Sequence, residues 1–488
     1  MSCRPRLRPK CFYDIVVEVA IIRPGPIVGQ MVNPYLKRRQ GREPITYPHP
    51  SLEPVLARTL GVPLFQEQLL RMAMIAAGFT GGEAEELRRA FGFKRSERRM
   101  RDIEVKLRAG MERNRIAPEA QQQIVNAVTS FALYGFPESH AASFALLAYA
   151  SAWLKCHYLA AFTAALLNNQ PMGFYHPSTI VKDAQRHGLK FKPADVMRSE
   201  WLCTLEPSRQ SPVASHPMPD AFATGDRQPA TGDFCVRLGL RYVKGLREEA
   251  ARVLVRERER RPFASIDELA RRVPELRKSE LVALAEVGAL NAVASGKWKV
   301  VSDPFSLSTN HFPLKFHRRD ALWQVERAAR DPGPLLEEIT ESDAASPLAM
   351  MTDEERLVAD FRGTGLTLGA HPMAYRRQEM DALGVRPARE LPGLPDGKRV
   401  RAAGCVIARQ RPGTARGFVF LSLEDETGIA NAIITPDLFE QNRLLLVGEQ
   451  FLLVEGVLQN LDNVVSVKAE RVLPLEITHA ATSSHDFH

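Results

Sequence analysis

Residues 131–168 read FALYGFPESHAASFALLAYASAWLKCHYLAAFTAALLN, and this stretch decides how the chain is interpreted. A Tyr-Gly-Phe-Pro turn at residues 134–137 interrupts an apolar, alanine-rich segment of helical length. The turn predicts that Ser139 and His140 lie just before a long helix that starts at Ala141. Small polar groups at a helix entrance form a natural site for a phosphate or a sugar. A capping serine followed by a histidine is also common for structural reasons, so these residues alone do not name a ligand.

Helical periodicity runs through the first part of the chain, to about residue 205. The segments LEPVLARTL, FQEQLLRMAMIAAGF, GEAEELRRAF and EAQQQIVNAVTSFALYGF carry apolar residues at spacings of three and four. Residues 80–83, Thr-Gly-Gly-Glu, have the form of a capping box, which predicts a helix from about Gly82 toward Phe91. This part of the chain is therefore expected to be a helical body.

A second module follows a segment rich in proline, serine, glycine and aspartate, residues 206–234, which is typical of a linker. Residues 235–292 alternate short helices with turns at Gly245, in LRYVKGL, and Gly288, in EVGAL. Such a repeat is typical of tandem helix-hairpin-helix units, which offer backbone N–H groups to a phosphate without reading bases. A glycine that merely ends a helix gives the same pattern.

The period changes to two from Lys398 to about Leu475, where five strand-like segments appear and a helical segment, DLFEQNRLLLV, precedes the fourth. Five strands with one helix in that place predict an oligonucleotide/oligosaccharide-binding (OB) barrel. Such barrels bind single strands through stacking aromatic rings and cationic grooves. The candidates for that role are Phe418, Phe420, Arg409, Arg411 and Arg416. The two phenylalanines fit a core position equally well.

The net charge of +8 is unevenly distributed. Residues 1–42 carry nine Lys or Arg against two acids, and residues 88–115 carry eleven against four. Two such clusters in one half of a chain favour a polyanion partner, although a charge run is often only a solvated helix face. The six cysteines show no metal-ligand spacing, which favours reduced thiols and a cytoplasmic protein. No stretch approaches the roughly 18 apolar residues of a membrane span, so no membrane partner is expected.

Three stretches carry a resemblance to a known family: FYDIVVEVAIIRPGPIVGQMVNPYLKRR, SLEPVLARTLGVPLFQEQLLRMAMIAAGFTGGEAEELRRAFGFKR and the turn and helix quoted first. In this order they resemble the fingers of bacterial C-family DNA polymerases, the DNA polymerase III alpha-subunit family. HRRDALWQVERAARDPGPL and the tail ATSSHDFH are closer to the error-prone branch. The resemblance implies part of an error-prone DNA-directed DNA polymerase, a nucleotidyltransferase that acts in DNA replication past damage, translesion synthesis and DNA repair. The alternative is a truncated, catalytically inactive DNA-binding protein.

The expected fold is a multidomain α+β chain with mainly α-helical fingers, a tandem helix-hairpin-helix module and a C-terminal β-barrel of OB type. The expected divisions are the end of a palm and entry to the fingers at 1–30, fingers at 31–205, a linker at 206–234, hairpins at 235–292, an irregular connector at 293–396 with an unusual insertion at about 293–316, an OB-fold at 397–476 and a tail at 477–488. The family's PHP domain, thumb and most of its palm are expected to be missing. The apolar residues 12–22 would then lie exposed, which predicts poor solubility.

The resemblance implies binding residues and no catalytic ones. The family's metal-binding carboxylates precede the first matching stretch, so Mg²⁺ is expected for the full-length family and no residue of this chain is assigned to a metal. By this resemblance, Arg88 and Arg89 match positions that contact the triphosphate, and Lys94 offers a third charge beside them. Ser139 and His140 correspond to the place where the family screens the sugar 2′ position. The alternative is that the two arginines only cap the C-terminal end of a helix, but the match favours phosphate contact. DNA contacts are expected from Arg23, Lys37, Arg38, Arg39, Lys244, Gly245 and Gly288.

The expected ligands are primer-template DNA and a deoxynucleoside triphosphate. Residues 441–446, QNRLLL, superficially resemble a clamp-binding peptide, but their place in the predicted barrel helix indicates a core segment. The chain is therefore expected to be recruited by accessory translesion proteins and, through them, by the sliding clamp.

Overall fold

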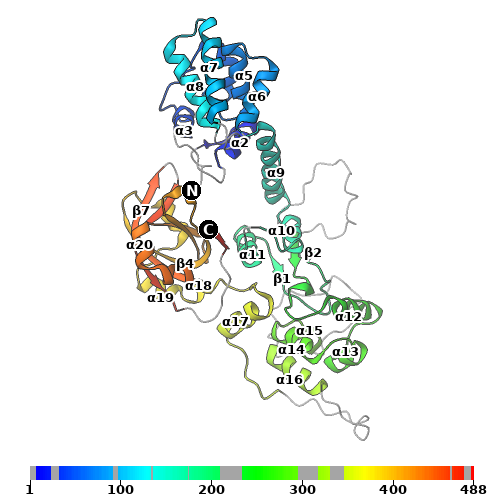
Figure 1. The fold of residues 1–488 in the computed structure, drawn as a ribbon. Helices are drawn as coiled ribbons and strands as arrows, with labels where there is room; N and C mark the ends of the chain where they lie inside the picture. The colour runs from blue at the N-terminus through cyan, green and yellow to red at the C-terminus, as the bar shows by residue number, and fades with distance from the viewer. Residues whose placement is uncertain are drawn as a thin grey trace.

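The computed structural model describes residues 7–22, 32–91, 97–132, 136–173, 175–208, 233–294, 317–329, 346–461, 464–476 and 485–487. Figure 1 shows an N-terminal helical body, a long helix α9 that leads from it to a middle body, and a β-barrel drawn to the left of α9 and α10. Helices and strands occupy separate parts of the chain, so the predicted multidomain α+β class is confirmed.

The N-terminal body is built from α2 Phe12–Ile21, α3 Val32–Arg39, η1 Pro50–Leu52, α4 Glu53–Leu56, η2 Ala57–Thr59, α5 Gln66–Ala77, α6 Gly81–Phe91, α7 Glu97–Arg113 and α8 Pro118–Ala132. The predicted capping box at the start of α6 is confirmed. The Glu83 N–H donates to the Thr80 hydroxyl at 3.3 Å, and the Thr80 N–H donates to the Glu83 carboxylate at 2.9 Å. The apolar faces of α5, α7 and α8 enclose one core beneath this helix.

The exposed apolar surface expected at residues 12–22 is confined to the two ends of the segment, where Phe12 and Ile22 are 42% and 52% exposed. Between them, Val16 and Val17 of α2 are buried against Ala141 and Ala145 of α9. The small alanine side chains let the two helices approach closely. Further exposed apolar side chains lie on α9, Glu138–His157, where Phe144, Leu146, Leu147, Tyr149, Trp153 and Leu154 are each at least 39% exposed.

The middle body joins α10 Leu159–Asn168 and α11 Pro177–Arg186 to a three-stranded sheet of β1 Phe191–Lys192, β2 Thr204–Pro207 and β3 Phe234–Arg237. The central strand β3 runs parallel to β1 and antiparallel to β2. The linker predicted at 206–234 therefore begins and ends inside paired strands. Its residues 209–232 lie outside the described residues.

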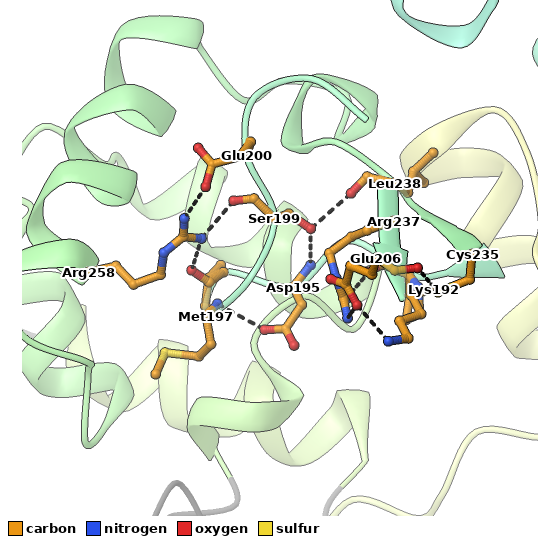
Figure 2. A network of polar contacts seen from close by, with 12 residues as sticks. Lys192, Asp195, Met197, Ser199, Glu200, Glu206, Cys235, Arg237, Leu238 and Arg258 are labelled. Carbon is orange, nitrogen blue, oxygen red and sulfur yellow. Dashed lines mark hydrogen bonds and ion pairs between the residues drawn. The ribbon is translucent and has the colours of Figure 1, made fainter. Parts of the chain in front are cut away.

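The hairpin module comprises η3 Leu240–Tyr242, α12 Glu248–Arg260, α13 Ile266–Arg272, α14 Lys278–Glu286, α15 Asn291–Ala294 and α16 Arg318–Ala328, which share one apolar core. A polar network fixes this module to the sheet (Figure 2). Arg258 of α12 donates to the carbonyls of Val196 and Ser199 at 3.1 and 2.7 Å and pairs with Glu200 at 2.6 Å. On the sheet itself, Glu206 binds Lys192 and Arg237.

The connector predicted as irregular is largely helical where the structure describes it. Its elements are α16, α17 Asp353–Thr364, α18 Pro372–Tyr375, α19 Arg377–Ala382 and η4 Ala388–Gly393. Ala321 and Val325 of α16 are buried in the hairpin core, and Met373 and Met380 pack on the barrel. Of the insertion expected at about 293–316, residues 295–316 lie outside the described residues.

The barrel consists of β4 Arg399–Gln410, β5 Val419–Glu424, β6 Ile429–Ile434, α20 Pro436–Gln441, α21 Arg443–Gly448, β7 Phe451–Leu461 and β8 Val464–Pro474. The strand order β5-β6-β8-β7-β4, closed by pairing of β4 with β5, confirms the predicted OB barrel. Gly404 permits the closure, because a Cβ there would lie 2.6 Å from the Glu424 carbonyl oxygen.

Two details of the barrel differ from expectation. Within residues 441–446, Leu446 is buried but Leu444 is 90% exposed, so the segment is only partly core. The predicted tail contains a strand, β9 His485–Phe487, which pairs in parallel with the end of β4.

Candidate nucleotide and nucleic-acid interface

The start of α9 is anchored by side chains from two other helices. The Tyr13 hydroxyl of α2 donates to the Glu138 carboxylate at 2.7 Å, and the Glu138 N–H donates to Glu67 of α5 at 2.9 Å. The Gln66 N–H donates to the Phe136 carbonyl at 3.1 Å. The entrance of α9 is therefore held rigidly to the N-terminal body.

Ser139 and His140 lie in the first turn of α9, because the helix begins at Glu138 rather than at Ala141. Both are exposed. The His140 ring contacts Phe136 and Phe144, with ring centroids 5.4 and 4.7 Å apart. This aromatic row was missed in the sequence, although its spacing of four residues was the signal that would have shown it.

Arg58 is a second feature that the sequence did not indicate. Its guanidinium lies 3.5 Å above the Tyr13 ring and its side chain is 66% exposed. It also approaches the Glu138 carboxylate, at 4.0 Å. An exposed cation therefore stands beside the anchored entrance of α9.

Arg88 and Arg89 share one carboxylate on α6. Arg88 donates to both oxygens of Glu85, at 2.8 and 2.7 Å, and Arg89 donates at 3.2 Å. The hydrogen bond from Arg88 is the largest influence on Glu85 and lowers its pKa to about 2. The arginine side chains remain 50% and 73% exposed, so a phosphate can reach them. Lys94 lies outside the described residues.

Of the expected basic run on α3, only Lys37 is directed to solvent. Arg38 donates to the carbonyl oxygens of Thr46 and Leu60 at 3.1 and 2.8 Å. Arg39 binds the Asp14 carboxylate at 2.6 Å. These two guanidiniums hold loops of the N-terminal body together, which the run of charges did not indicate. Arg23 lies outside the described residues.

The two hairpin glycines both have positive φ, +85° at Gly245 and +83° at Gly288. At Gly245 no described atom comes within 4 Å of a Cβ position, whereas at Gly288 the Arg318 Nε lies 3.0 Å from it. Lys244 is exposed, but its N–H donates to the Gly363 carbonyl at 2.7 Å. The hairpins therefore adopt the expected turns and already contact other parts of the chain.

One face of the barrel carries the expected aromatic residues. The register places Phe420 opposite Ile433 and Ser422 opposite Asn431, outside the core that Leu421 and its neighbours form. Phe420 is half-buried. Phe418 is also half-buried, and Arg416 beside it is exposed.

The expectation that Arg409 lines a cationic groove was wrong. Its side chain is 8% exposed, and it donates to the carbonyls of Leu446, at 2.7 Å, and Glu449. Arg411 lies 4.5 Å above the Phe439 ring and remains 44% exposed. The alternating pattern of β4 could not reveal that the helix after β6 folds over one of its arginines.

The predicted residues form separate groups. Figure 1 places the α6 and α9 sites at the N-terminal end of α9 and the hairpins beyond its other end. Within the described residues, no three His, Cys, Asp or Glu side chains gather into a metal-binding group. No helix in the described part of the chain is both long and apolar enough to cross a membrane.

Three family models match the chain. Residues 1–115 match the bacterial DNA polymerase III alpha subunit finger domain, residues 188–300 a helix-hairpin-helix motif, and residues 400–475 an OB-fold nucleic acid binding domain. Among solved structures, asparaginyl-tRNA synthetase from Pyrococcus horikoshii is 26% identical over 18% of this chain and 22% of that one. Its TM-score of 0.16 is too low to support an argument.

Curated relatives match along the whole chain. An error-prone DNA polymerase of Anaeromyxobacter sp. (strain K) is 46% identical, with 100% of this chain and 40% of that protein covered. Error-prone DNA polymerase 2 of Agrobacterium fabrum (strain C58) is 43% identical, with 100% and 42% covered. The chain thus spans about two fifths of the length of these relatives. Over that span, the chain is similar to error-prone DNA polymerases, and its first 115 residues match the finger domain of the bacterial DNA polymerase III alpha subunit.

Proposed function

We propose that the chain supplies the nucleotide- and template-binding part of an error-prone DNA polymerase that copies past damaged template. The observation that carries the proposal is the 46% identity to an error-prone polymerase along the whole chain. The arrangement of the N-terminal body supports it, because exposed arginines and an anchored helix entrance are suited to an anionic nucleotide. The same proposal includes binding to accessory translesion proteins, recruitment to the sliding clamp through those proteins, and a cytoplasmic location.

In this proposal Arg88 and Arg89 bind the triphosphate. A guanidinium fork matches phosphate oxygens, and Glu85 holds both forks together before a nucleotide arrives. The pairs with Glu85 are exposed, so they compete weakly with a triphosphate. Ser139 and His140, fixed in the first turn of α9, screen the 2′ position of the sugar.

Mg²⁺ is the metal that the family's reaction implies. The described residues contain no group of carboxylates that would hold it, so we assign it no ligand and no chemical step in this chain. A primer-extension assay with Mg²⁺ tests this assignment, since the purified chain alone is expected to incorporate no nucleotide, whereas triphosphate binding separates the proposed role from that of a DNA-binding protein without catalysis. Incorporation by the purified chain would contradict the assignment of the metal site to residues outside it.

Replacing both Arg88 and Arg89 with alanine is expected to weaken deoxynucleoside triphosphate binding about 10- to 100-fold, because hydrogen bonds to charged groups contribute about 1.5–3 kcal/mol. Titration calorimetry with the triphosphate measures the change. The matched control is Arg108→Ala, which removes another half-exposed arginine paired with a glutamate one helical turn away. Unchanged binding in the double variant, or an equal loss in the control, would contradict the assignment.

Phe420→Ala is expected to weaken binding of single-stranded DNA by about 1–3 kcal/mol, because a base would stack on the accessible part of this half-buried ring. Fluorescence anisotropy with a short labelled oligonucleotide measures it. Ile429→Ala is the control: Ile429 is 43% exposed, lies on the same face of β5 and β6, and has no ring. Equal losses in the two variants would show that apolar area matters and stacking does not.

A further inference from the structure

The last turn of α17 lies against both hairpins. The Lys244 N–H donates to the Gly363 carbonyl oxygen at 2.7 Å, and the Lys244 ammonium donates to the Phe361 carbonyl oxygen at 3.2 Å. On the second hairpin, a Cβ at Gly363 would lie 2.3 Å from the Val287 Cγ1. The absence of a side chain at Gly363 therefore lets this turn reach both hairpins at once.

The Glu280 carboxylate accepts hydrogen bonds from the next donors of the first hairpin, which belong to Arg247. The Arg247 N–H, at the start of α12, donates to the Glu280 Oε1 at 2.9 Å. The Arg247 guanidinium binds the same carboxylate at 3.0 and 2.9 Å. The Glu280 side chain is 2% exposed. Its oxygens stand at the α12 N-terminus, a position that favours an anion.

The groups that a DNA phosphate would use on this hairpin thus face anion-like partners from the chain itself. Hairpins of this kind bind phosphate through backbone N–H groups and a nearby cation. Here the Lys244 N–H and ammonium face carbonyl oxygens at the C-terminal end of α17, which is the negative end of its dipole. These oxygens take the place of phosphate oxygens.

The two groups that accept from the first hairpin, Glu280 and the last turn of α17, differ in how firmly they are held. Glu280 is buried inside the hairpin core region and also accepts from the Arg277 N–H at 2.8 Å. The apolar residues of α17, Leu357 and Phe361, form a small cluster outside the hairpin core. A cavity of about 320 Å³ lies beside α17, lined by Leu357, Asp360, Thr364 and Arg318 among others. The incomplete packing leaves α17 as the occupant that can be displaced.

Polar contacts of Asp360, together called the clasp, hold α17 in place. Asp360 accepts from Arg318 at 2.7 Å and from the Thr367 hydroxyl at 2.7 Å. Arg318 also donates to the Glu286 carbonyl at 3.2 Å, at the end of α14. Arg318 therefore connects α17 to the second hairpin.

We propose that residues 360–365, the last turn of α17, are an intramolecular plug that blocks the first hairpin from binding a DNA phosphate. The proposal rests on the DNA-binding function proposed above. Releasing the plug frees the Lys244 N–H and ammonium from the Gly363 and Phe361 carbonyl oxygens and adds one phosphate contact to the DNA interface.

Gly363→Ala tests the plug, because the added methyl group pushes the turn away from Val287. Binding of a primer-template duplex is measured at several salt concentrations. The variant is expected to bind about 3- to 10-fold tighter at 0.1 M salt, with a log–log salt slope steeper by about 0.9, the value for one phosphate. Gly448→Ala is the matched control, since it also places a methyl at the end of a helix but meets no atom within 4 Å.

A second pair of variants identifies the hairpin as the source of the gain. Lys244→Gln is expected to remove the whole gain in the Gly363→Ala background, so that the double variant binds no more tightly than Lys244→Gln alone. Asp360→Asn, which weakens the clasp without changing volume, is expected to reproduce the gain. Amide hydrogen exchange at Lys244 reports release of the plug directly, by becoming faster in both unseated variants.

The outcomes separate this inference from the proposed function. If neither the unaltered chain nor the variants bind DNA, the DNA-binding function fails and the plug with it. If the unaltered chain binds and faster exchange at Lys244 brings no change in salt slope, only the plug is overturned. An equal loss on Lys244→Gln with and without Gly363→Ala also overturns it, because the hairpin would then bind DNA with α17 in place.

Discussion

Replacing Glu280 with alanine is expected to lower the free energy of unfolding of the hairpin module by about 2–3 kcal/mol, because this buried carboxylate accepts hydrogen bonds of the charged kind, which contribute about 1.5–3 kcal/mol. The carboxylate accepts from the N–H groups of Arg247 and Arg277 as well as from the Arg247 guanidinium. Burial raises the pKa of Glu280, but these hydrogen bonds outweigh burial and lower the pKa to about 2. Urea unfolding followed by circular dichroism measures the loss.

The pH dependence provides a check on the same residue. A carboxyl group whose pKa is lowered by folding stabilises the protein above its ordinary pKa, and that stabilisation is lost as the pH falls toward the lowered value. Unfolding near pH 2 should therefore show a smaller difference between the unaltered chain and the Glu280→Ala variant than at pH 7. Glu248→Ala is the control, since this exposed glutamate pairs with Arg252 on the same module and should cost less than about 1 kcal/mol. Equal stability of the unaltered chain and Glu280→Ala would contradict the prediction.

The barrel is expected to lose stability as the pH rises from about 4.5 to 7, through Glu424. This side chain is 3% exposed and binds Arg186 of α11 at 2.7 Å. Burial raises the pKa of Glu424 to about 7, against the opposing charges of Arg186 and Lys182. Because the folded protein holds this proton more tightly than the unfolded chain does, the stabilisation is complete below the ordinary pKa and is lost through pH 7. The linked free energy is about 3 kcal/mol.

The other titratable groups at this contact require a difference measurement. Burial lowers the pKa of His371, which faces Glu424 at 3.9 Å, to about 3, so its contribution has the opposite sign below pH 6.5. Burial lowers the pKa of Lys182 to about 8, so its contribution changes above that value. Asp183 lies close enough to raise the pKa of Glu424 further. The measured quantity is therefore the stability of the unaltered chain minus that of Glu424→Gln.

That difference is expected to fall by up to about 3 kcal/mol between pH 4.5 and pH 7. Thermal or urea unfolding at four pH values in this range provides it. Glu470→Gln is the matched control on the same barrel, because the Glu470 side chain is 42% exposed, and it should leave the trend of the unaltered chain in place. A difference independent of pH would show that Glu424 titrates as an exposed carboxyl group does.

The parts of the fold that could be predicted are those with a local signal. The alternation in β4 to β8 and the helix before β7 were enough to identify the barrel, because its strands have one core face and one outer face. The capping box also predicted the start of α6, because its hydrogen bonds join residues only three positions apart, Thr80 and Glu83. The connector was misjudged because its helices are short and divide their apolar residues between two cores, as Ala321 and Met373 show.

The contacts that shape the site are not local, and the sequence could not reveal them. Tyr13 meets Glu138 across 125 positions of chain, and Lys244 meets Phe361 across 117. Arg88 and Arg89 were identified by a motif, but the charge pattern around Arg38 and Arg39 did not distinguish guanidiniums that bind backbone carbonyls from those left to solvent. Charge runs locate a basic surface and do not assign its members.

The exposure of α9 has a mechanical consequence. After Ala145 no residue of α9 is buried, and the helix leaves the N-terminal body with only surface contacts, such as Tyr149 with Phe12 of α2 and Lys155 with Asp183 of α11. An α-helix of 20 residues is about 30 Å long. A tilt of about 10° at its base therefore swings its far end by about 5 Å, given that length. Because hydrogen bonds hold the entrance at Glu138 to the N-terminal body, a small rotation of that body is amplified along α9 at α10.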